Sequence, residues 1–248
     1  MTTSAFHRSR PRPHRRRPRK AIAIPQLIHA LHLPLPFHLG RVNSYLLQSD
    51  VGFVLVDTGG SNARQELMTQ LDRSGCAPGS LRLVLLTHGD FDHIGNAAHL
   101  RTTLGATLAM HPDDAPMAER GDMFANRHRP NVILRSLLRF FTGIGSSDRF
   151  SPDVQVRDGF DLSPFGLRAR VIEIPGHSRG SIGILTADQV LFCGDLLENG
   201  KRPALNGLMD DRAAARRSLE KLQGLKIGWV YPGHGKPFEM NQLQADAP

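Results

Sequence analysis

Cysteine is scarce in this chain of 248 residues, which has only Cys76 and Cys193. Two thiols are too few for a disulfide framework or for a zinc site built from cysteine. Long apolar runs are also missing, since no window approaches the roughly 18 uninterrupted apolar residues that indicate a transmembrane helix. We therefore expect a protein without a membrane span, in the reducing environment of the cytoplasm.

Acidic residues are missing from the N-terminal part of the chain, where the first one is Asp50. Residues 1–20 hold seven Arg and one Lys, which equals the formal net charge of +8, and the rest of the chain balances 23 basic with 23 acidic residues. Prolines interrupt this segment and prevent a continuous helix, so we expect residues 1–22 to be a disordered basic tail. Nucleic acid would bind only through this tail. A targeting peptide and an arm attracted to membranes are the alternatives.

The remaining residues, 23–248, contain enough apolar side chains to build the core of a single domain. Apolar runs predict strands within 44–60, at 81–86 and 106–110, after residue 168 and within 227–235. Helical spacing of apolar residues predicts helices at 62–75, 96–105 and 211–223. Strands that alternate with helices in two halves predict an α/β layered domain. The halves are separated by an insert at about 112–160 with a helical stripe at 131–141, which would either form a lid over the site or pack on the core.

Five polar clusters follow the predicted strands, where loops hold side chains above a rigid scaffold. They are Asp57 in VDTGG, the run THGDFDH with His88, Asp90, Asp92 and His93, His177 in PGHSRG, Asp195 in FCGD, and His234 in YPGHG. Alternate residues of an extended segment share a side, so His88, Asp90 and Asp92 would face one cavity and a turn would add His93. Imidazole and carboxylate groups are the usual ligands of zinc, iron and manganese.

Each cluster has an ordinary structural interpretation when it is taken singly. His177 and His234 are typical of loop residues that form hydrogen bonds. Asp195 fits the cap of a following helix, and Asp57 fits an Asx-turn. The combination favours a metal site, because four ionisable side chains within residues 88–93, beside a buried strand, would be costly without a cation.

The ordered motifs VDTG, THGDFDHIG, PGHS, GD and PGHG, spread over residues 35–240, resemble the metallo-β-lactamase-fold hydrolase superfamily. The resemblance implies a four-layered αβ/βα sandwich with two metal ions at the edge of its sheets. The first metal would be bound by His88, Asp90 and His177. The second would be bound by Asp92, His93 and His234. Asp195 would bridge the two ions, and Asp57 would orient the ligand loop without binding metal.

The sequence departs from the family pattern at one position, because Asp90 stands where His-x-His-x-Asp-His has its second His. Three carboxylates and a bridging hydroxide would then neutralise two divalent cations, where the usual site keeps one positive charge. We expect weaker attraction of polyanionic substrates, with zinc as the first choice of metal and manganese or iron as alternatives. If Asp90 turns away instead, the first site is weak and the enzyme mononuclear.

The resemblance implies a metal-dependent hydrolase in which Asp92, Asp195 and His93 act in catalysis around a metal-bridging hydroxide. We expect a small-molecule carboxylic ester, thioester or lactone as substrate. An apolar wall in the insert would suit an acyl group; its residues are Met117, Met123, Phe124, Leu137, Phe140 and Phe141. Alternatively, Arg127, Arg129 and Arg179 would engage a carboxylate or phosphate.

A phosphodiesterase or nuclease is the alternative function, ahead of a β-lactamase or a non-catalytic binding protein. The oligomeric state stays open.

Overall fold

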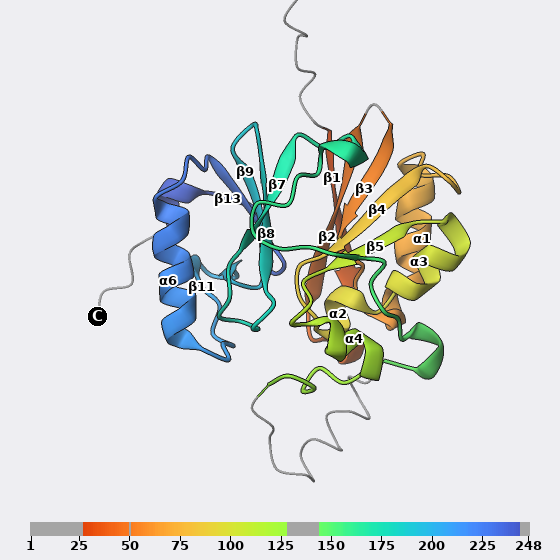
Figure 1. Cartoon of the computed structure of the whole chain (residues 1–248), viewed down its shortest axis with the longest axis horizontal. Coiled ribbons are helices and arrows are strands. Elements are labelled where there is room, and N and C mark those ends of the chain that lie inside the picture. Colours follow the sequence, from red (N-terminus) through yellow and green to blue (C-terminus); the bar gives the residue numbers. More distant parts are fainter. Residues whose placement is uncertain (1–26, 50, 128–143, 244–248) are drawn as a thin grey trace, which may run out of the picture.

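The computed structural model describes residues 27–49, 51–127 and 144–243. Two β-sheets face each other in the middle of the molecule, and helices cover their outer sides (Figure 1). The first sheet has the order β1-β2-β3-β4-β5-β6. Its strands are β1 Ile28–Pro34, β2 Arg41–Ser49, β3 Gly52–Val56, β4 Leu81–Leu86, β5 Thr107–Met110 and β6 Val154–Gln155. The first three strands pair antiparallel, and β3 to β6 pair parallel.

The second sheet has the order β13-β12-β9-β8-β7, and a separate pair is formed by β10 and β11. These strands are β7 Ala169–Glu173, β8 Ile182–Thr186, β9 Val190–Gly194, β10 Leu197–Asn199, β11 Pro203–Leu205, β12 Trp229–Pro232 and β13 Phe238–Glu239. β9 and β12 are parallel neighbours, as β3 and β4 are in the first sheet. In each sheet, the carboxyl ends of two adjacent strands therefore meet at one edge.

Helices α1 and α3 lie on the outer side of the first sheet, and α6 lies on the outer side of the second (Figure 1). The α-helices are α1 Arg64–Arg73, α2 Phe91–Ile94, α3 Ala97–Leu104, α4 Ala115–Arg120 and α6 Arg212–Gln223. Short 3-10 turns are η1 Pro36–His38, η2 Ser61–Ala63, η3 Ser146–Asp148, η4 Ser163–Phe165 and η5 Met240–Gln242. Among the described residues, no helix has both the length and the apolar character that crossing a bilayer requires.

Three apolar cores separate the four layers. Along β3, Phe53 and Leu55 belong to the core under α1 and α3, whereas Val54 and Val56 belong to the core between the sheets. A third core, which includes Leu219 and joins the second sheet to α6, completes the stack. Strands buried on both faces have continuous apolar sequences, and this explains the run at 81–86. The predicted αβ/βα sandwich is thus confirmed.

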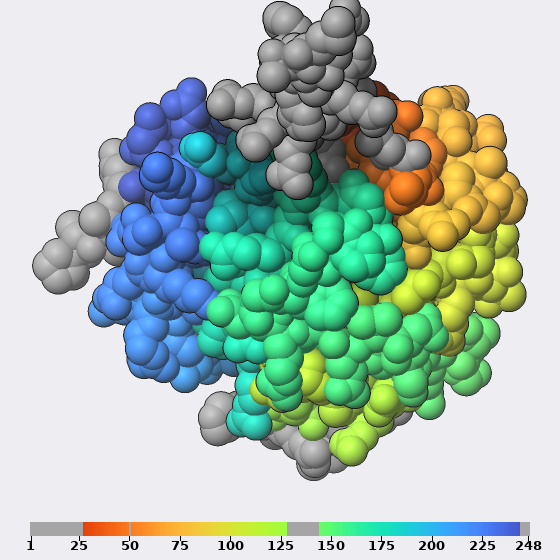
Figure 2. Space-filling view, turned by 45° about the horizontal axis from the view of Figure 1, so that its top comes forward, coloured from red at the N-terminus to blue at the C-terminus, as the bar shows by residue number. Residues whose placement is uncertain are grey.

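The two halves are tied together beside the predicted ligand loops. Asn43 on β2 donates through Nδ2 to the carbonyl oxygen of Pro232 at 2.9 Å, and Tyr45 Oη donates to the same oxygen at 2.6 Å. In the space-filling view, the green segment after residue 144 lies between the orange and yellow first half and the blue second half (Figure 2). The loops that follow strands of both sheets are thereby held at one seam.

Most predicted elements are confirmed close to their predicted bounds. The strand at 81–86 is β4, and the helix at 96–105 is α3 with Gly105 as a left-handed C-cap at φ 73°. Asp211 caps α6 by accepting from Ala214 N at 2.9 Å. The ordinary interpretation of Asp195 as the cap of a following helix is wrong, because β10 follows it and no helix begins there.

Several predictions fall on parts of the chain that the structure does not describe. The basic tail at 1–22 and the helical stripe at 131–141 lie outside the described residues, as do Arg129, Leu137, Phe140 and Phe141. Of the predicted apolar wall, Met117 lies in α4 and is completely buried, so it belongs to the interior rather than to a surface. The lid therefore stays a prediction.

Candidate metal centre

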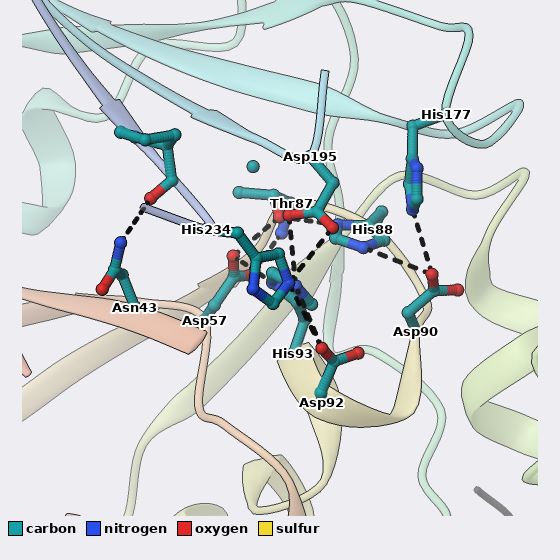
Figure 3. Close-up of polar contacts among 12 residues, drawn as sticks. Asn43, Asp57, Thr87, His88, Asp90, Asp92, His93, His177, Asp195 and His234 are labelled. Carbon is teal, nitrogen blue, oxygen red and sulfur yellow. Dashed lines mark hydrogen bonds and ion pairs between the residues drawn. The ribbon is translucent and has the colours of Figure 1, made fainter. Parts of the chain in front are cut away.

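The loops at the seam bring together all seven side chains that the sequence singled out as ligands. They form three overlapping groups, within each of which the ligand atoms lie no more than 4.8 Å apart: His88, Asp90 and His177; His88, His93 and Asp195; and Asp92, His93 and His234. The first and third groups match the two predicted metal sites, and the second group joins them through Asp195. Figure 3 shows these side chains converging from both sheets.

The local backbone differs from the extended segment that the sequence suggested. Asp90 has extended dihedral angles, but it is the N-cap of the short helix α2. Its carbonyl oxygen accepts from His93 N at 2.9 Å and from Ile94 N at 3.1 Å. Asp92 and His93 therefore reach the centre from a helical turn, and the prediction of alternation through Asp92 was wrong. The backbone hydrogen bonds to the Asp90 carbonyl oxygen favour a helical turn here over the extended conformation that the sequence pattern suggested.

The outer nitrogen of each imidazole is held by an oxygen of the surrounding loops. His177 Nδ1 lies 2.6 Å from the carbonyl oxygen of Leu208, and His234 Nδ1 lies 3.0 Å from that of Arg41. A carbonyl oxygen only accepts, so both Nδ1 atoms carry the proton. The lone pair of each neutral ring is then on Nε2, which faces the centre.

The same tautomer follows for the other two histidines from the bonds of Asp57. Its Oδ2 lies 2.9 Å from His93 Nδ1 and accepts from Thr87 Oγ1 at 2.7 Å. Since the hydroxyl hydrogen of Thr87 is used in that bond, Thr87 Oγ1 accepts from His88 Nδ1 at 2.9 Å. All four Nε2 atoms are thus available as ligands, with their ring orientation fixed from outside. The prediction that Asp57 supports the ligand loop agrees with this geometry.

Asp195 lies between the two halves of the cluster. Its Oδ1 is 3.3 Å from His93 Nε2, and its Oδ2 is 3.4 Å from His234 Nε2. Asp92 Oδ2 is 3.4 Å from His234 Nε2 and 3.9 Å from His93 Nε2. Both His93 and His234 belong to the predicted second site. The group of His88, His93 and Asp195 also brings this carboxylate within 4.8 Å of His88 in the first site, as a bridging ligand requires.

Three buried polar atoms in the centre have no hydrogen-bond partner: His88 Nε2, His93 Nε2 and Asp195 Oδ1. Such atoms are rare in folded proteins because each costs the free energy of its lost hydration. They belong to ligand types that divalent transition metals prefer. The cluster therefore fits a metal ion in both its geometry and its donor set.

The charges of the cluster lead to the same conclusion. Burial lowers the pKa of His93, but Asp195, Asp57 and Asp92 outweigh it and raise that pKa to about 9. Burial likewise opposes a charge on His234, yet Asp195 and Asp92 raise its pKa to about 11. The buried carboxylates are thus stabilised by positive charge nearby. Bound cations supply this charge while the imidazoles stay neutral.

Asp90 does not turn away from the centre. Its Oδ2 lies 3.0 Å from His177 Nε2 and 3.7 Å from His88 Nε2, while the other oxygen points out of the cluster (Figure 3). That other oxygen, Oδ1, forms an ion pair with Arg127 Nη1. Burial raises the pKa of Asp90, but Arg127, His177 and His88 outweigh it and hold the pKa far below its usual value. The charge count made from the sequence was therefore incomplete, because it omitted Arg127.

Asp114 is a functional candidate that sequence reasoning missed. It is completely buried, and its carboxylate accepts from Gly89 N at 3.0 Å, Gly180 N at 2.9 Å and Ser178 Oγ at 2.6 Å. It thereby joins the loop of His88 and Asp90 to the loop of His177. The sequence signal was weak, since HPDD at 111–114 follows a predicted strand but carries no motif.

Comparisons with known proteins agree with this geometry. The family model of the metallo-beta-lactamase superfamily matches residues 39–234. Human metallo-beta-lactamase domain-containing protein 1 is 30% identical over 210 residues, which cover 84% of this chain and 68% of that protein. An atrochrysone carboxyl ACP thioesterase of Aspergillus fumigatus is 27% identical over 213 residues, covering 84% of this chain and 55% of the relative.

A solved structure has the same architecture. The crystal structure of TTHA1623 in a di-iron-bound form is 26% identical, with a TM-score of 0.65 over 84% of this chain and 95% of that one. The matched family region contains every residue of the cluster described above, from Asp57 to His234. The chain therefore belongs to the metallo-beta-lactamase superfamily.

Proposed function

We propose that this chain is a binuclear metal-dependent hydrolase that cleaves a carboxylic ester, thioester or lactone bond of a small molecule. The observation that carries the proposal is the set of four Nε2 atoms turned inward around the carboxylates of Asp92 and Asp195. The first metal would be held by His88, Asp90 and His177, the second by Asp92, His93 and His234, with Asp195 between them. Zinc is the first choice, and the di-iron form of a related structure keeps iron open.

Two divalent ions bound in such a site supply Lewis-acid polarisation of a carbonyl oxygen and lower the pKa of water toward neutrality. The protein contributes a rigid ligand shell. Asp195 places one oxygen beside each of two histidines, His93 and His234, where a bound ion would join carboxylate and imidazole. Little reorganisation of these side chains is then needed during the reaction.

Asp92 is the proposed residue for moving a proton. Its Oδ2 lies near His93 and His234, and its side chain retains 12% exposure, more than the carboxylates of Asp57, Asp90 and Asp195. The Asp92 carboxylate therefore contacts the metal centre on one side and solvent on the other. It is therefore placed to take up a proton and pass it to a leaving group.

The choice of an acyl substrate rests on two observations. Leu208, whose carbonyl oxygen lies 2.6 Å from His177 Nδ1, is 77% exposed, so one apolar residue lies at the surface near the first group of ligands. In addition, Arg127 has carboxylate partners within the chain, so it is not free to bind an anionic substrate. The similarity to a thioesterase supports the same class of bond.

A panel of substrates with defined metals tests the proposal. The zinc-, manganese- and iron-loaded protein should hydrolyse at least one of a nitrophenyl ester, a lactone and an acyl thioester, in preference to bis-nitrophenyl phosphate. Asp195→Ala should lose activity by orders of magnitude, while circular dichroism shows a folded chain. Activity confined to the phosphate diester would overturn the substrate class, and unchanged activity of Asp195→Ala would overturn the centre.

A further inference from the structure

Arg127 is an arginine almost completely buried against the proposed first metal site. Only 6% of its side chain is exposed. Besides the ion pair with Asp90 Oδ1, its Nη2 donates to the carbonyl oxygen of His177 at 3.4 Å, and its Nε lies 2.7 Å from Asp210 Oδ2. The Nε–H is not aligned on that oxygen, so the Asp210 contact is an ion pair without a hydrogen bond.

The charges of Asp90 and Arg127 compensate each other. A first site of three neutral histidines has no net ligand charge, and Asp90 in place of one of them adds one negative charge. The guanidinium, always protonated in proteins, returns one positive charge on the side of Asp90 that faces away from the centre. Asp210 is one-third exposed, and the screening by water weakens its influence.

The pair also determines how Asp90 can bind. A free carboxylate can offer both oxygens to a metal, whereas here Arg127 occupies Oδ1 and leaves only Oδ2 facing His177 and His88. An imidazole likewise offers one atom. Asp90 with Arg127 behind it therefore matches an imidazole in both net charge and number of donor atoms.

We propose that Asp90 and Arg127 form a matched pair that replaces one histidine of the first metal site, with Asp90 as a one-oxygen ligand and Arg127 as its positioning residue. This inference rests on the proposed function, since it presumes that the first site binds a metal ion. It has an unexpected consequence: Asp90→His, which restores the usual family pattern, damages the site as long as Arg127 is present. The substitution removes the buried partner of the guanidinium and leaves it only the partly exposed Asp210, next to a cation.

A double-mutant cycle on zinc binding tests the pair. The variants are Asp90→His, Arg127→Met and the double variant, and the readouts are zinc stoichiometry and affinity, from competition with a chromophoric chelator, together with Tm. Each single substitution should lower the affinity of the first site by about 10–100-fold, the usual effect of losing a partner of a ligand. The double variant should bind zinc more tightly than either single variant and recover most of the lost Tm.

Two further variants distinguish the loss of the Asp90–Arg127 pair from the loss of any positive charge near the site. Arg179 lines the same cavity of about 340 Å³ as Arg127 and Asp210, but it is exposed, so Arg179→Met is the matched control and should bind zinc like the wild type. Arg127→Lys keeps the charge without the planar fork, and it should retain more affinity than Arg127→Met.

The possible results are distinguishable. Additive losses in the double variant, or wild-type affinity in Asp90→His, would overturn the matched pair and leave the proposed hydrolase intact. A wild-type protein that binds no zinc, manganese or iron would overturn the proposed function and this inference with it. If Asp90→His does not fold, recovery of folding and zinc binding in the double variant supports the pair, and its failure to recover overturns it.

Discussion

Asp57 Oδ2 lies 2.9 Å from His93 Nδ1, and both side chains are buried. Asp57 has a φ of 58°, a left-handed conformation that is uncommon for a residue other than glycine. The backbone thus adopts an unfavourable conformation at the point where its carboxylate reaches His93 and Thr87. We interpret this as strain retained because it fixes a ligand.

Asp57→Asn should weaken metal binding at the second site by about 10–100-fold. Oδ2 accepts from Thr87 Oγ1 and His93 Nδ1, and Oδ1 accepts from Thr87 N at 2.8 Å. An amide has only one accepting oxygen, so its NH2 group would face a donor at one of the two positions and displace the His93 ring. Zinc affinity measured by chelator competition checks this expectation. Asp72→Asn, on the exposed side of α1, is the control and should change nothing. Equal affinity of Asp57→Asn and the wild type would contradict the role of Asp57.

Gly233→Ala should lower activity by on the order of 100-fold while the chain stays folded. A Cβ atom at this position would collide with Asp195 Oδ1 and would lie 2.7 Å from His93 Cε1, so both side chains must move. A shift of about 1 Å at such a centre costs on the order of 100-fold in rate. Gly200→Ala meets no atom within 4 Å and is the matched control. Comparable rates for the two variants would show that the centre tolerates displacement.

Asp114→Asn should destabilise the protein by about 1–3 kcal/mol, since a buried amide nitrogen would face backbone N–H groups that now donate to a carboxylate. It should also lower the affinity of the first metal site, because the loops of Asp90 and His177 lose their common anchor. Urea unfolding and zinc titration measure the two effects. A loss of stability with unchanged zinc affinity would limit Asp114 to a structural role.

Removal of metal should lower the thermal stability. An ion that binds only the folded state stabilises it by about 2.7 kcal/mol at a hundredfold excess over Kd. The Tm should therefore fall on addition of a chelator and return when zinc is restored. The chelator should have little effect on Asp195→Ala, which lacks the proposed bridge. The same Tm for the wild type with and without chelator would argue against a resident metal.

The stability should depend on pH through Asp158, far from the metal centre. Burial raises its pKa, but hydrogen bonds from Lys221 Nζ at 2.7 Å and Glu173 N at 2.9 Å outweigh this and lower it. A lowered folded pKa gives stability that is present above the unfolded pKa, near 3.8, and is lost as pH falls through the folded value.

Because this carboxylate is largely exposed, Asp158→Asn should cost only about 0.2–1 kcal/mol at pH 7 and less at pH 2. Urea unfolding of variant and wild type at both values, with chelator present throughout, measures the difference. A difference of equal size at pH 2 would mean that the carboxylate charge plays no part.

The sequence predicted the layered fold because its strands are buried on both faces and its helices carry clear caps, as at Gly105 and Asp211. It also identified the seven clustered side chains, since each follows a strand. It did not reveal Arg127 as a partner of Asp90, because the pairing depends on how segments far apart in the chain pack. The same holds for Asp114, whose partners come from two distant loops.

The hydrogen bond from Asn43 to Pro232 spans 189 positions of the chain. Each proposed metal site combines ligands from residues 88–93 with one that follows much later in the chain, His177 in the first site and His234 in the second. Contacts of such long range are slow to form, because closing the long intervening chain costs conformational entropy. On the ribosome, neither site is complete until its second-half ligand has emerged. A chain arrested before His177 therefore holds neither complete set of ligands.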